Sequence, residues 1–341
     1  MRRFCIASLI AVGAISLALS GSTATAVATS PRAAPPVGTQ LSELKGSDTV
    51  ARDYLGYSVA ISGTSAVVGA PGYAGHSGRA YVFTKTRAGW KQAAELKGSD
   101  TAAGDYFGYS VAISGTTAIV GAPGLARVYV FTKTGAGWKQ AAELKGSDTV
   151  VGDAFGDSVA ISGTSAVAGA DGHAKAAGRA YMFTKTGAGW KQAAELKGSD
   201  TVAGDLFGGS VATSGTSAVV GASGYARDAG RVYVFTKTGA GWKQAAELKG
   251  SDTVAGDYFG DSVAISGTTI VAGAPVFTKE AGQAYVFTNT ASGWKQAAEL
   301  KGSDTVARDY FGDSVATSGT SAVVGADGRA KAAGRAYVFE A

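Results

Sequence analysis

Side chains that usually carry catalysis or bind metals are scarce in this sequence. Among 341 residues there are one cysteine, Cys5, and two histidines, His76 and His173. A single thiol excludes a disulfide framework and a multi-cysteine zinc site, and the two histidines lack a ligand-like partner pattern, so we expect them to be exposed and unpaired. The sequence contains no Gly-x-Ser-x-Gly elbow, phosphate-cradling loop or zinc-protease helix. These observations predict a protein that is not an enzyme and needs no cofactor.

Aspartate is the one potential ligand that recurs regularly. One precedes each Phe-Gly pair or its equivalent: Asp53, Asp105, Asp153, Asp205, Asp257 and Asp309. They could bind a ligand, but regular copying favours a turn role in which the carboxylate accepts nearby backbone N–H groups. A less regular set follows the glycine of the pair at Asp157, Asp261 and Asp313, where other copies have Tyr57, Tyr109 and Gly209. This set could attract a cation or a polar ligand, or it could simply be solvated.

These aspartates belong to a unit that is copied six times. The marker Glu-Leu-Lys-Gly-Ser-Asp begins at Glu43, Glu95, Glu143, Glu195, Glu247 and Glu299. The period is roughly 50 residues, and the second copy is shortened between Gly121 and Tyr129, which marks a surface loop. Glycine accounts for 51 residues while 45% of the chain is hydrophobic, so a packed, turn-rich repeat fold is expected, neither collagen nor a disordered tail.

Each copy contains four short β-forming runs with a period of two residues. In the first copy the runs cover residues 56–62, 65–70, 79–84 and 90–97. In the third run Tyr81 and Phe83 share one face. Ala80 and Val82 share the other, so both faces are apolar, as a sheet lying between two neighbours requires. Four antiparallel strands at this period are typical of a propeller blade.

The fourth run differs from the other three because charged residues alternate along it. This alternation suits an outermost strand, where charges discourage edge-to-edge pairing. Each complete copy has one tryptophan in this run: Trp90, Trp138, Trp190, Trp242 and Trp294. A residue repeated in this way is expected to pack between blades rather than to serve as a ligand platform.

The sixth copy ends at Ala341 with three runs only. Residues 39–45 align with the fourth run of the first copy, because Glu43-Leu44-Lys45 matches the residues that begin at Glu95. A strand contributed by this N-terminal segment would complete the last blade and remove two open edges. The prediction is therefore an all-β fold: residues 39–341 form a six-bladed β-propeller of four-stranded antiparallel blades, closed by an N-terminal strand.

The repeated motifs resemble a known family. Phe107-Gly108 is followed about a dozen residues later by Gly121-Ala122-Pro123, and the segment 104–115 precedes it in the same copy. This pattern resembles the second type of FG-GAP repeat of secreted bacterial proteins and, more distantly, the integrin α-subunit propeller. Three copies depart from the pattern, since Asp171, Ser223 and Asp327 replace the final proline.

Integrin-type blades often carry a carboxylate-rich calcium loop between the first two strands. Here that loop reads Ser62-Gly63-Thr64-Ser65 and has no carboxylate in any copy. Because Ca²⁺ needs six to eight hard oxygen ligands, we expect no calcium at this position.

The resemblance implies that the Phe-Gly strand is innermost and that the loop between the second and third strands shares a face with the connection leading into each blade. Propellers usually bind on the loop-rich face. The candidate surface combines constant residues of the Asp100 and Asp105 type with variable residues. The candidate ligand-binding residues are Tyr73, His76, Leu125, His173, Lys175, Tyr225, Arg227, Lys279, Arg329 and Lys331. The candidate residues at the mouth of the central channel are Tyr57, Tyr109, Asp157, Asp261 and Asp313.

The N-terminus has the features of an export signal. Arg2 and Arg3 precede an apolar run that reaches Leu19, and small residues permit cleavage after Ala26 or Ala28. We therefore expect a signal peptide at residues 1–28 and a Pro/Ala-rich linker at 29–38, with a permanent N-terminal anchor as the alternative. The mature chain is expected to be secreted, either free or at the cell surface, without a transmembrane segment. A net charge of +5 is modest and gives no reason to expect nucleic acid.

Together these features predict a secreted, monomeric, non-enzymatic propeller. It would bind an extracellular protein or a carbohydrate through loops on one face, and similar blades would give multivalent contact. One alternative is a hydrolase or lyase at the channel mouth that uses carboxylates such as Asp157 and Asp171. Another is a structural envelope component without a specific ligand, and the fold alone does not select among the three.

Overall fold

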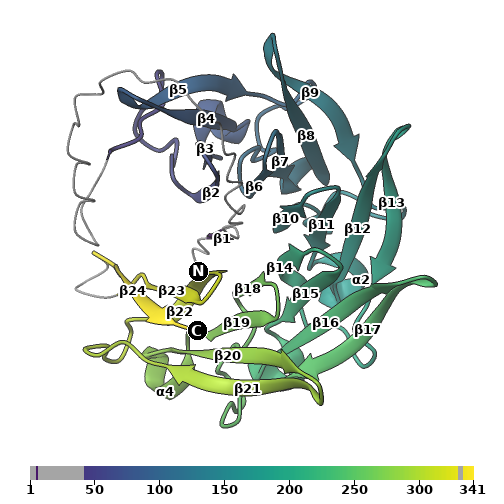
Figure 1. Cartoon of the computed structure of the whole chain (residues 1–341), viewed down its shortest axis with the longest axis vertical. Coiled ribbons are helices and arrows are strands. Elements are labelled where there is room, and N and C mark those ends of the chain that lie inside the picture. The colour runs from purple at the N-terminus through teal and green to yellow at the C-terminus, as the bar shows by residue number, and fades with distance from the viewer. Residues whose placement is uncertain (1–4, 7–41, 329–332) are drawn as a thin grey trace, which may run out of the picture.

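Each sequence copy folds into one antiparallel sheet. The computed structural model describes residues 5–6, 42–328 and 333–341. Within these residues, six sheets built from consecutive strands surround a central axis, and the first strand of each lies nearest that axis (Figure 1). The architecture is a six-bladed β-propeller, as the repeat predicts.

The strands follow one another in the same order in every blade. Blade 1 contains β2 (Ser58–Ser62), β3 (Ser65–Ala70), β4 (Arg79–Thr86) and β5 (Gly89–Leu96). Blade 2 contains β6 (Val111–Ser114), β7 (Thr117–Ala122), β8 (Arg127–Thr134) and β9 (Gly137–Leu144). Blade 3 contains β10 (Val159–Ser162), β11 (Ser165–Ala170), β12 (Arg179–Thr186) and β13 (Gly189–Leu196).

The remaining blades continue this pattern. Blade 4 contains β14 (Phe207–Ser214), β15 (Ser217–Ala222), β16 (Arg231–Thr238) and β17 (Gly241–Leu248). Blade 5 contains β18 (Val263–Ser266), β19 (Thr269–Ala274), β20 (Gln283–Thr290) and β21 (Gly293–Leu300). Blade 6 contains β22 (Phe311–Ser318), β23 (Ser321–Ala326) and β24 (Arg335–Glu340).

The hydrophobic core lies between the blades. Ala80 and Val82 of blade 1 are fully buried against a face of blade 2 that presents Phe107, Tyr129 and Phe131. The Phe107 ring meets the Phe131 ring edge to face, with centroids 6.0 Å apart. Burial of each such aromatic side chain contributes about 1.5–3 kcal/mol, and the contact recurs at the following interfaces. The prediction that both faces of the third strand are buried is confirmed in blades 1 to 5.

Two glycines explain why the Phe-Gly and Gly-Ala-Pro motifs occur together. Gly69 of blade 1 lies against the backbone of Gly108 in blade 2, so that a Cβ atom at Gly69 would overlap the Gly108 carbonyl oxygen. Gly108 has φ +89°, and a Cβ atom there would overlap the carbonyl oxygen of Arg79. Only glycine permits this backbone conformation and this close approach of two blades.

Serine side chains connect the innermost strands of neighbouring blades. The Ser58 hydroxyl oxygen accepts a hydrogen bond from the Val111 N–H at 3.0 Å, and Ser62 accepts one from the Gly115 N–H at 3.0 Å. Equivalent bonds join later blades, including that from the Val211 N–H to Ser158. Each bond contributes on the order of 1 kcal/mol, so the repeated serines link neighbouring blades.

The fourth strand lies at the rim, as predicted. In β5 the side chains of Lys91 and Glu95 are exposed while Leu96 is buried. Trp138 packs partly buried against the core between blades 1 and 2. Trp190, Trp242 and Trp294 pack between blades in the same way, which confirms the expected packing role for these four tryptophans. Trp90 packs against blade 1 alone within the described residues.

Blade 6 has three strands in the described part of the chain. The predicted closing strand at residues 39–45 falls partly outside the described residues, and residues 42–45 are not in a strand. Val338 is 65% exposed, whereas Val82, at the same position in blade 1, is fully buried. Leu44 packs against Val68, Ala70, Tyr81 and Phe83 of blade 1. Closure by an N-terminal strand therefore stays a prediction.

The proposed signal peptide is described only at β1 (Cys5–Ile6), which pairs in parallel with Ser58 and Val59 of β2. Its cleavage site and the linker at 29–38 lie outside the described residues. In the part of the chain that the structure describes, no helix has both the length and the apolar character needed to cross a membrane.

Candidate functional site

The loops between the second and third strands share one face with the leading segments, which run from the fourth strand of one blade to the first strand of the next. Residues 97–110, between β5 and β6, are the leading segment of blade 2. In blade 1 this variable loop covers residues 71–78 and includes a short helical turn, α1 (Tyr73–His76). The Gly72 N–H donates to the Asp53 carbonyl oxygen at 3.1 Å, and the Tyr106 N–H donates to the His76 carbonyl oxygen at 2.8 Å. The loops of blades 1, 3, 4 and 5 therefore each lie between the leading segment of their own blade and that of the next.

Equivalent loops contain η1 (Pro123–Leu125) in blade 2, α2 (His173–Ala176) in blade 3, α3 (Tyr225–Asp228) in blade 4 and α4 (Phe277–Glu280) in blade 5. Residues with positive φ interrupt the four α turns, for example Lys175 at +59° and Arg227 at +61°. The left-handed region is uncommon for residues other than glycine. The residues with positive φ reverse the direction of the chain within each loop, and the side chains of Lys175 and Arg227 are exposed.

The aspartate before each Phe-Gly pair has the turn role that the sequence predicts. The Val50 N–H donates to the Asp53 carboxylate at 2.7 Å, and the Ala102 N–H donates to Asp105 at 2.6 Å. The same bond forms in the other four blades. Burial raises the pKa of the Asp205 and Asp257 carboxyl groups above the usual range.

The aspartate of the Gly-Ser-Asp marker also has a structural partner. The Tyr81 hydroxyl donates to Asp48 at 2.6 Å, and equivalent tyrosines bond the marker aspartates of the other blades, including Asp100. The bond from Tyr81 lowers the pKa of Asp48, and burial together with the carboxylate raises the pKa of Tyr81. The constant carboxylates therefore fasten the leading segments to the blades.

The two candidate ligand-binding tyrosines are hydrogen-bonded to marker aspartates. Tyr73 donates its hydroxyl to Asp48 at 2.8 Å, and Tyr225 donates to Asp200 at 2.6 Å. The Arg79 guanidinium lies over the Tyr73 ring at 4.6 Å, and Arg231 lies over Tyr225 at 4.5 Å. Burial opposes ionisation of Asp200, but the hydrogen bonds from Tyr225 and Tyr233 lower its pKa overall. Both rings are held in place at the face.

The two histidines differ from the expectation that they are exposed and unpaired. His173 has a side chain only 15% exposed, its Nδ1 lies 2.9 Å from the Asp153 carboxylate, and its Nε2 lies 3.5 Å from that of Asp148. The expectation is wrong for His173 because folding brings the turn aspartate Asp153 and the marker aspartate Asp148 of blade 3 next to it. His76 is exposed, but its ring packs on Tyr106 with centroids 4.9 Å apart.

The remaining candidates in the variable loops do not form one cluster. Leu125 packs against the core between blades 1 and 2. Lys175, Arg227 and Lys279 are exposed in three successive blades. Arg329 and Lys331 lie outside the described residues.

The channel-mouth residues precede or begin the innermost strands of their blades. Tyr57 and Tyr109 of blades 1 and 2 face one another, with ring centroids 4.8 Å apart and an angle of 49° between the rings. Asp157 is buried, while Asp261 and Asp313 are half-buried. At this position blades 1 and 2 therefore have tyrosines, whereas blades 3, 5 and 6 have aspartates. That these residues line the mouth of a channel stays a prediction.

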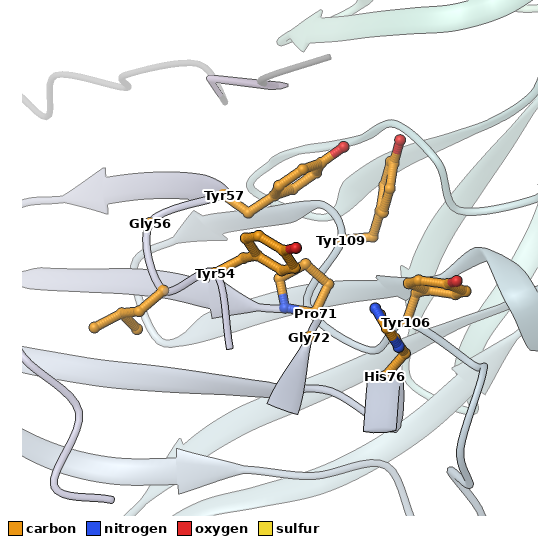
Figure 2. A pocket seen from close by; sticks show the side chains of 9 residues that line it. Tyr54, Gly56, Tyr57, Pro71, Gly72, His76, Tyr106 and Tyr109 are labelled. Atoms are coloured by element: carbon orange, nitrogen blue, oxygen red, sulfur yellow. The ribbon is translucent and has the colours of Figure 1, made fainter. Parts of the chain in front are cut away.

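An aromatic pocket lies between blades 1 and 2 on this face. It has a volume of about 370 Å³, and its walls are Tyr54, Leu55, Gly56, Tyr57, Pro71, Gly72, His76, Tyr106 and Tyr109. Figure 2 shows the rings of Tyr57 and Tyr109 side by side, with the ring of Tyr54 next to Pro71 and the ring of Tyr106 beside His76. Tyr54 and Tyr106 are 45% and 38% exposed.

The pocket joins residues that the sequence analysis treated separately, and it adds Tyr54 and Tyr106. Those two tyrosines directly follow the turn aspartates Asp53 and Asp105. A sequence signal was available, since Tyr-x-Gly-Tyr at 54–57 and Tyr-Phe-Gly-Tyr at 106–109 occur in adjacent copies only. The missing information was that the variable loop of blade 1 lies between these two segments.

In the described residues, no group of three or more histidine, cysteine, aspartate or glutamate side chains is arranged to hold a metal ion. The loop from Ser62 to Ser65 is a tight turn between β2 and β3, with Gly63 at φ +56°. The absence of calcium there stays a prediction.

The fold and its repeated contacts define the class of protein: a propeller whose blades meet through paired Phe-Gly and Gly-Ala-Pro motifs. The family model of the FG-GAP repeat matches residues 39–83, 90–131, 138–183, 190–235, 242–287 and 294–339. The chain belongs to the FG-GAP repeat family.

Among solved structures, 419 chains match this fold. One is a crystal structure of a protein from Lactobacillus plantarum, which is 11% identical, with a TM-score of 0.50 over 83% of each chain. At this identity the likeness shows the fold alone. A search of curated proteins found no match.

Proposed function

We propose that this chain is a secreted, non-enzymatic binding protein whose loop face recognises an extracellular protein or a carbohydrate. The observation that carries the proposal is that constant and variable side chains on that face have different surroundings. The constant carboxylates, such as Asp53 and Asp48, are occupied by hydrogen bonds within the blade. The side chains that change from blade to blade, such as Lys175 and Arg227, are exposed beside them. A constant frame with variable exposed side chains is a common arrangement for recognition.

Secretion is proposed because residues 1–28 begin with basic residues, continue with an apolar run and end with small residues, as export signals do. A mature chain that begins after Ala26 or Ala28 would present the propeller as a monomer, in the medium or at the cell surface. Its net charge supports neither nucleic acid nor another strongly charged partner.

The second blade provides a matched control for testing the loop face. Its loop is four residues shorter than the others, and the blade still forms all four strands. Replacing residues 171–178, 223–230 and 275–282 with copies of Pro123–Ala126 should therefore preserve the fold while removing the variable side chains of blades 3, 4 and 5.

The test is a glycan array together with a pull-down from growth medium, each partner being confirmed in purified form. The full chain is expressed, and N-terminal sequencing of the exported product checks the cleavage. We expect the triple graft to weaken binding at least tenfold. Lys133→Ala in the β8–β9 hairpin and Lys185→Ala in the β12–β13 hairpin, at the other end of the strands, should leave binding unchanged. Equal binding by the grafted protein, or no binding in either assay, would contradict the proposal. Turnover of a substrate that Asp157→Asn abolishes would instead support an enzyme.

We also propose that residues 39–45 complete blade 6 and close the ring. The segment after residues 39–45 bonds to blade 1 in the same way as the segment after β5 bonds to blade 2. The Ser47 N–H donates to Gln92 at 2.8 Å, and the Ser99 N–H donates to Gln140 at 3.0 Å. The first family match begins at residue 39, and the other matches begin at the fourth strand, for example at residue 90. Closure is tested by comparing how much Val338→Asp and Val82→Asp lower the free energy of unfolding.

A further inference from the structure

We propose that the aromatic pocket between blades 1 and 2 binds a sugar ring of an uncharged oligosaccharide. The inference rests on the proposed function, since it assigns a ligand class and a position to the loop face. The residues that line the pocket come from three segments: the leading segment of blade 1, the variable loop of blade 1 and the leading segment of blade 2.

The shape of the pocket suits a small ring. Its volume of about 370 Å³ lies at the lower end of the range for small-molecule sites. The Tyr57 and Tyr109 rings are inclined at 49°, and the Tyr106 and His76 rings at 50°, so the rings form a cup rather than a flat stack (Figure 2). A cup of this kind can contact both the face and the edge of a bound ring.

The chemistry of the lining favours a neutral, polyhydroxylated ligand. Among the described residues that line the pocket, none is aspartate, glutamate, lysine or arginine. A cation or an anion would lose its hydration without gaining a charged partner there. The C–H groups of a sugar ring carry partial positive charge and suit the negative face of a tyrosine ring. Phenol hydroxyls can donate and accept hydrogen bonds, as sugar hydroxyls can.

The aromatic residues are not required by the fold. The position of Tyr54 and Tyr106 is occupied by Ala154 in blade 3 and Leu206 in blade 4, with φ between +56° and +58° at all four. The position of Tyr57 and Tyr109 is occupied by Asp157 and Gly209 in the same two blades. Since those two blades form the same sheets without an aromatic residue at either position, the sheets of blades 1 and 2 do not require these tyrosines.

A second depression continues from this pocket across the loop face. It has a volume of about 530 Å³ and shares Tyr54, Gly72 and His76 with the aromatic pocket. Its other walls are Val50, Ala51, Arg52, Asp53, Ala74 and Gly75. It would give room for further sugar units of a chain whose one ring occupies the aromatic pocket.

The experiment uses a glycan array containing neutral and charged oligosaccharides, followed by titration calorimetry with the neutral glycan that is best retained. Tyr54→Ala and Tyr106→Ala copy the residue that blade 3 has at Ala154, so the substitutions suit the backbone. We expect each to weaken binding at least tenfold, with unchanged circular dichroism. Tyr258→Ala, at the same position in blade 5 and away from the pocket, is the matched control and should bind like the wild type.

A crystal of the wild-type protein soaked with the same glycan gives a second measurement that needs no variant. Sugar density in the aromatic pocket supports the inference, and density elsewhere overturns it. The inference also fails if no neutral glycan is retained, if the tyrosine variants bind normally, or if choline displaces the glycan and itself binds more tightly, which would identify a cation site. If it fails while the loop grafts still abolish binding of a confirmed protein partner, the proposed function stands. If no partner of any kind is found, both fail.

Discussion

Tyr129 and Asp100 illustrate how single residues hold this molecule together. The ring of Tyr129 is fully buried against Phe107, and its hydroxyl donates to Asp100 at the surface end of the ring. The pair therefore joins a blade core to the segment that leads into the blade. The same pair recurs in all six blades, which explains why the Gly-Ser-Asp marker is so constant in the sequence.

These tyrosines predict sensitivity to alkaline conditions. Burial and the adjacent carboxylate raise the pKa of Tyr81, Tyr129, Tyr181, Tyr233 and Tyr285 above the ordinary value of 10.0. Because the folded pKa is the higher one, the stabilisation is complete below the unfolded pKa and is lost as pH rises above it. We expect the free energy of unfolding to fall steeply above about pH 10. Phenolate absorbance from these residues should appear together with the loss of the β-sheet circular dichroism.

A matched check is the double variant Tyr129→Phe and Tyr181→Phe, which should show a shallower fall of stability with pH. If all phenols titrate while the sheet signal is unchanged, the buried tyrosines do not govern alkaline unfolding.

At single positions the sequence predicts roles where the partner is local. The role of Asp53 was predictable because its partner, the Val50 N–H, is three residues away. The contacts of His173 with Asp148 and Asp153 were not, because they depend on the path of a loop that follows two intervening strands. The pocket around Tyr54 and Tyr106 was missed for the same reason, since three segments form it.

Strands and turns were predictable because their patterns repeat. Alternation along each run places β3 at Ser65–Ala70 as expected, and the observed β4 extends to Thr86 in the hairpin with β5. The sequence does not show which glycines contact a neighbouring blade, because a glycine needed for its φ value and one needed for close packing look the same. The structure separates the two at Gly104 and Gly108.

Those two glycines give a prediction about how the blades meet. Gly104 and Gly108 have nearly the same φ, +90° and +89°, but only Gly108 lies against the backbone of the neighbouring blade, whereas a Cβ atom at Gly104 would meet nothing within 4 Å. We expect Gly104→Ala to lower the free energy of unfolding by about 1 kcal/mol, since alanine resists positive φ. Gly108→Ala should cost at least about 2 kcal/mol more, because two blades must separate to admit the methyl group. Urea denaturation measures both, and equal costs would show that the blades do not depend on this contact.

The whole molecule presents two complementary faces that the described residues leave open. Val338 of blade 6 is 65% exposed and Val59 of blade 1 is 37% exposed, while their counterparts Val82 and Val111 are buried at the interface between blades 1 and 2. A Cβ atom at Gly56 would meet nothing within 4 Å, whereas one at its counterpart Gly108 would overlap the Arg79 carbonyl oxygen of the preceding blade. Blade 6 and blade 1 thus carry the two halves of a standard blade interface. The number of blades was predictable from the repeat, but closure depends on where residues 39–45 lie.

A charge at Val338 distinguishes a closed ring from an open one. If residues 39–45 complete blade 6 and bring it against blade 1, Val338 lies in a core like that of Val82. Val338→Asp should then cost about 3 kcal/mol or more, as Val82→Asp should, because an unpaired carboxylate would be buried. In an open ring Val338 faces water, and the substitution should change the free energy of unfolding by no more than about 0.5 kcal/mol.

The control for surface charge is Val306→Asp, because Val306 is 57% exposed in a leading loop away from the blade interfaces. Deleting residues 39–45 completes the comparison. In the closed ring this deletion removes the outer strand of blade 6, so it should destabilise the protein and also reduce the cost of Val338→Asp, since the interface would already be broken. Two changes that act through one interface are not additive, whereas independent changes are. Additive costs for the deletion and Val338→Asp would therefore contradict closure through the N-terminal segment.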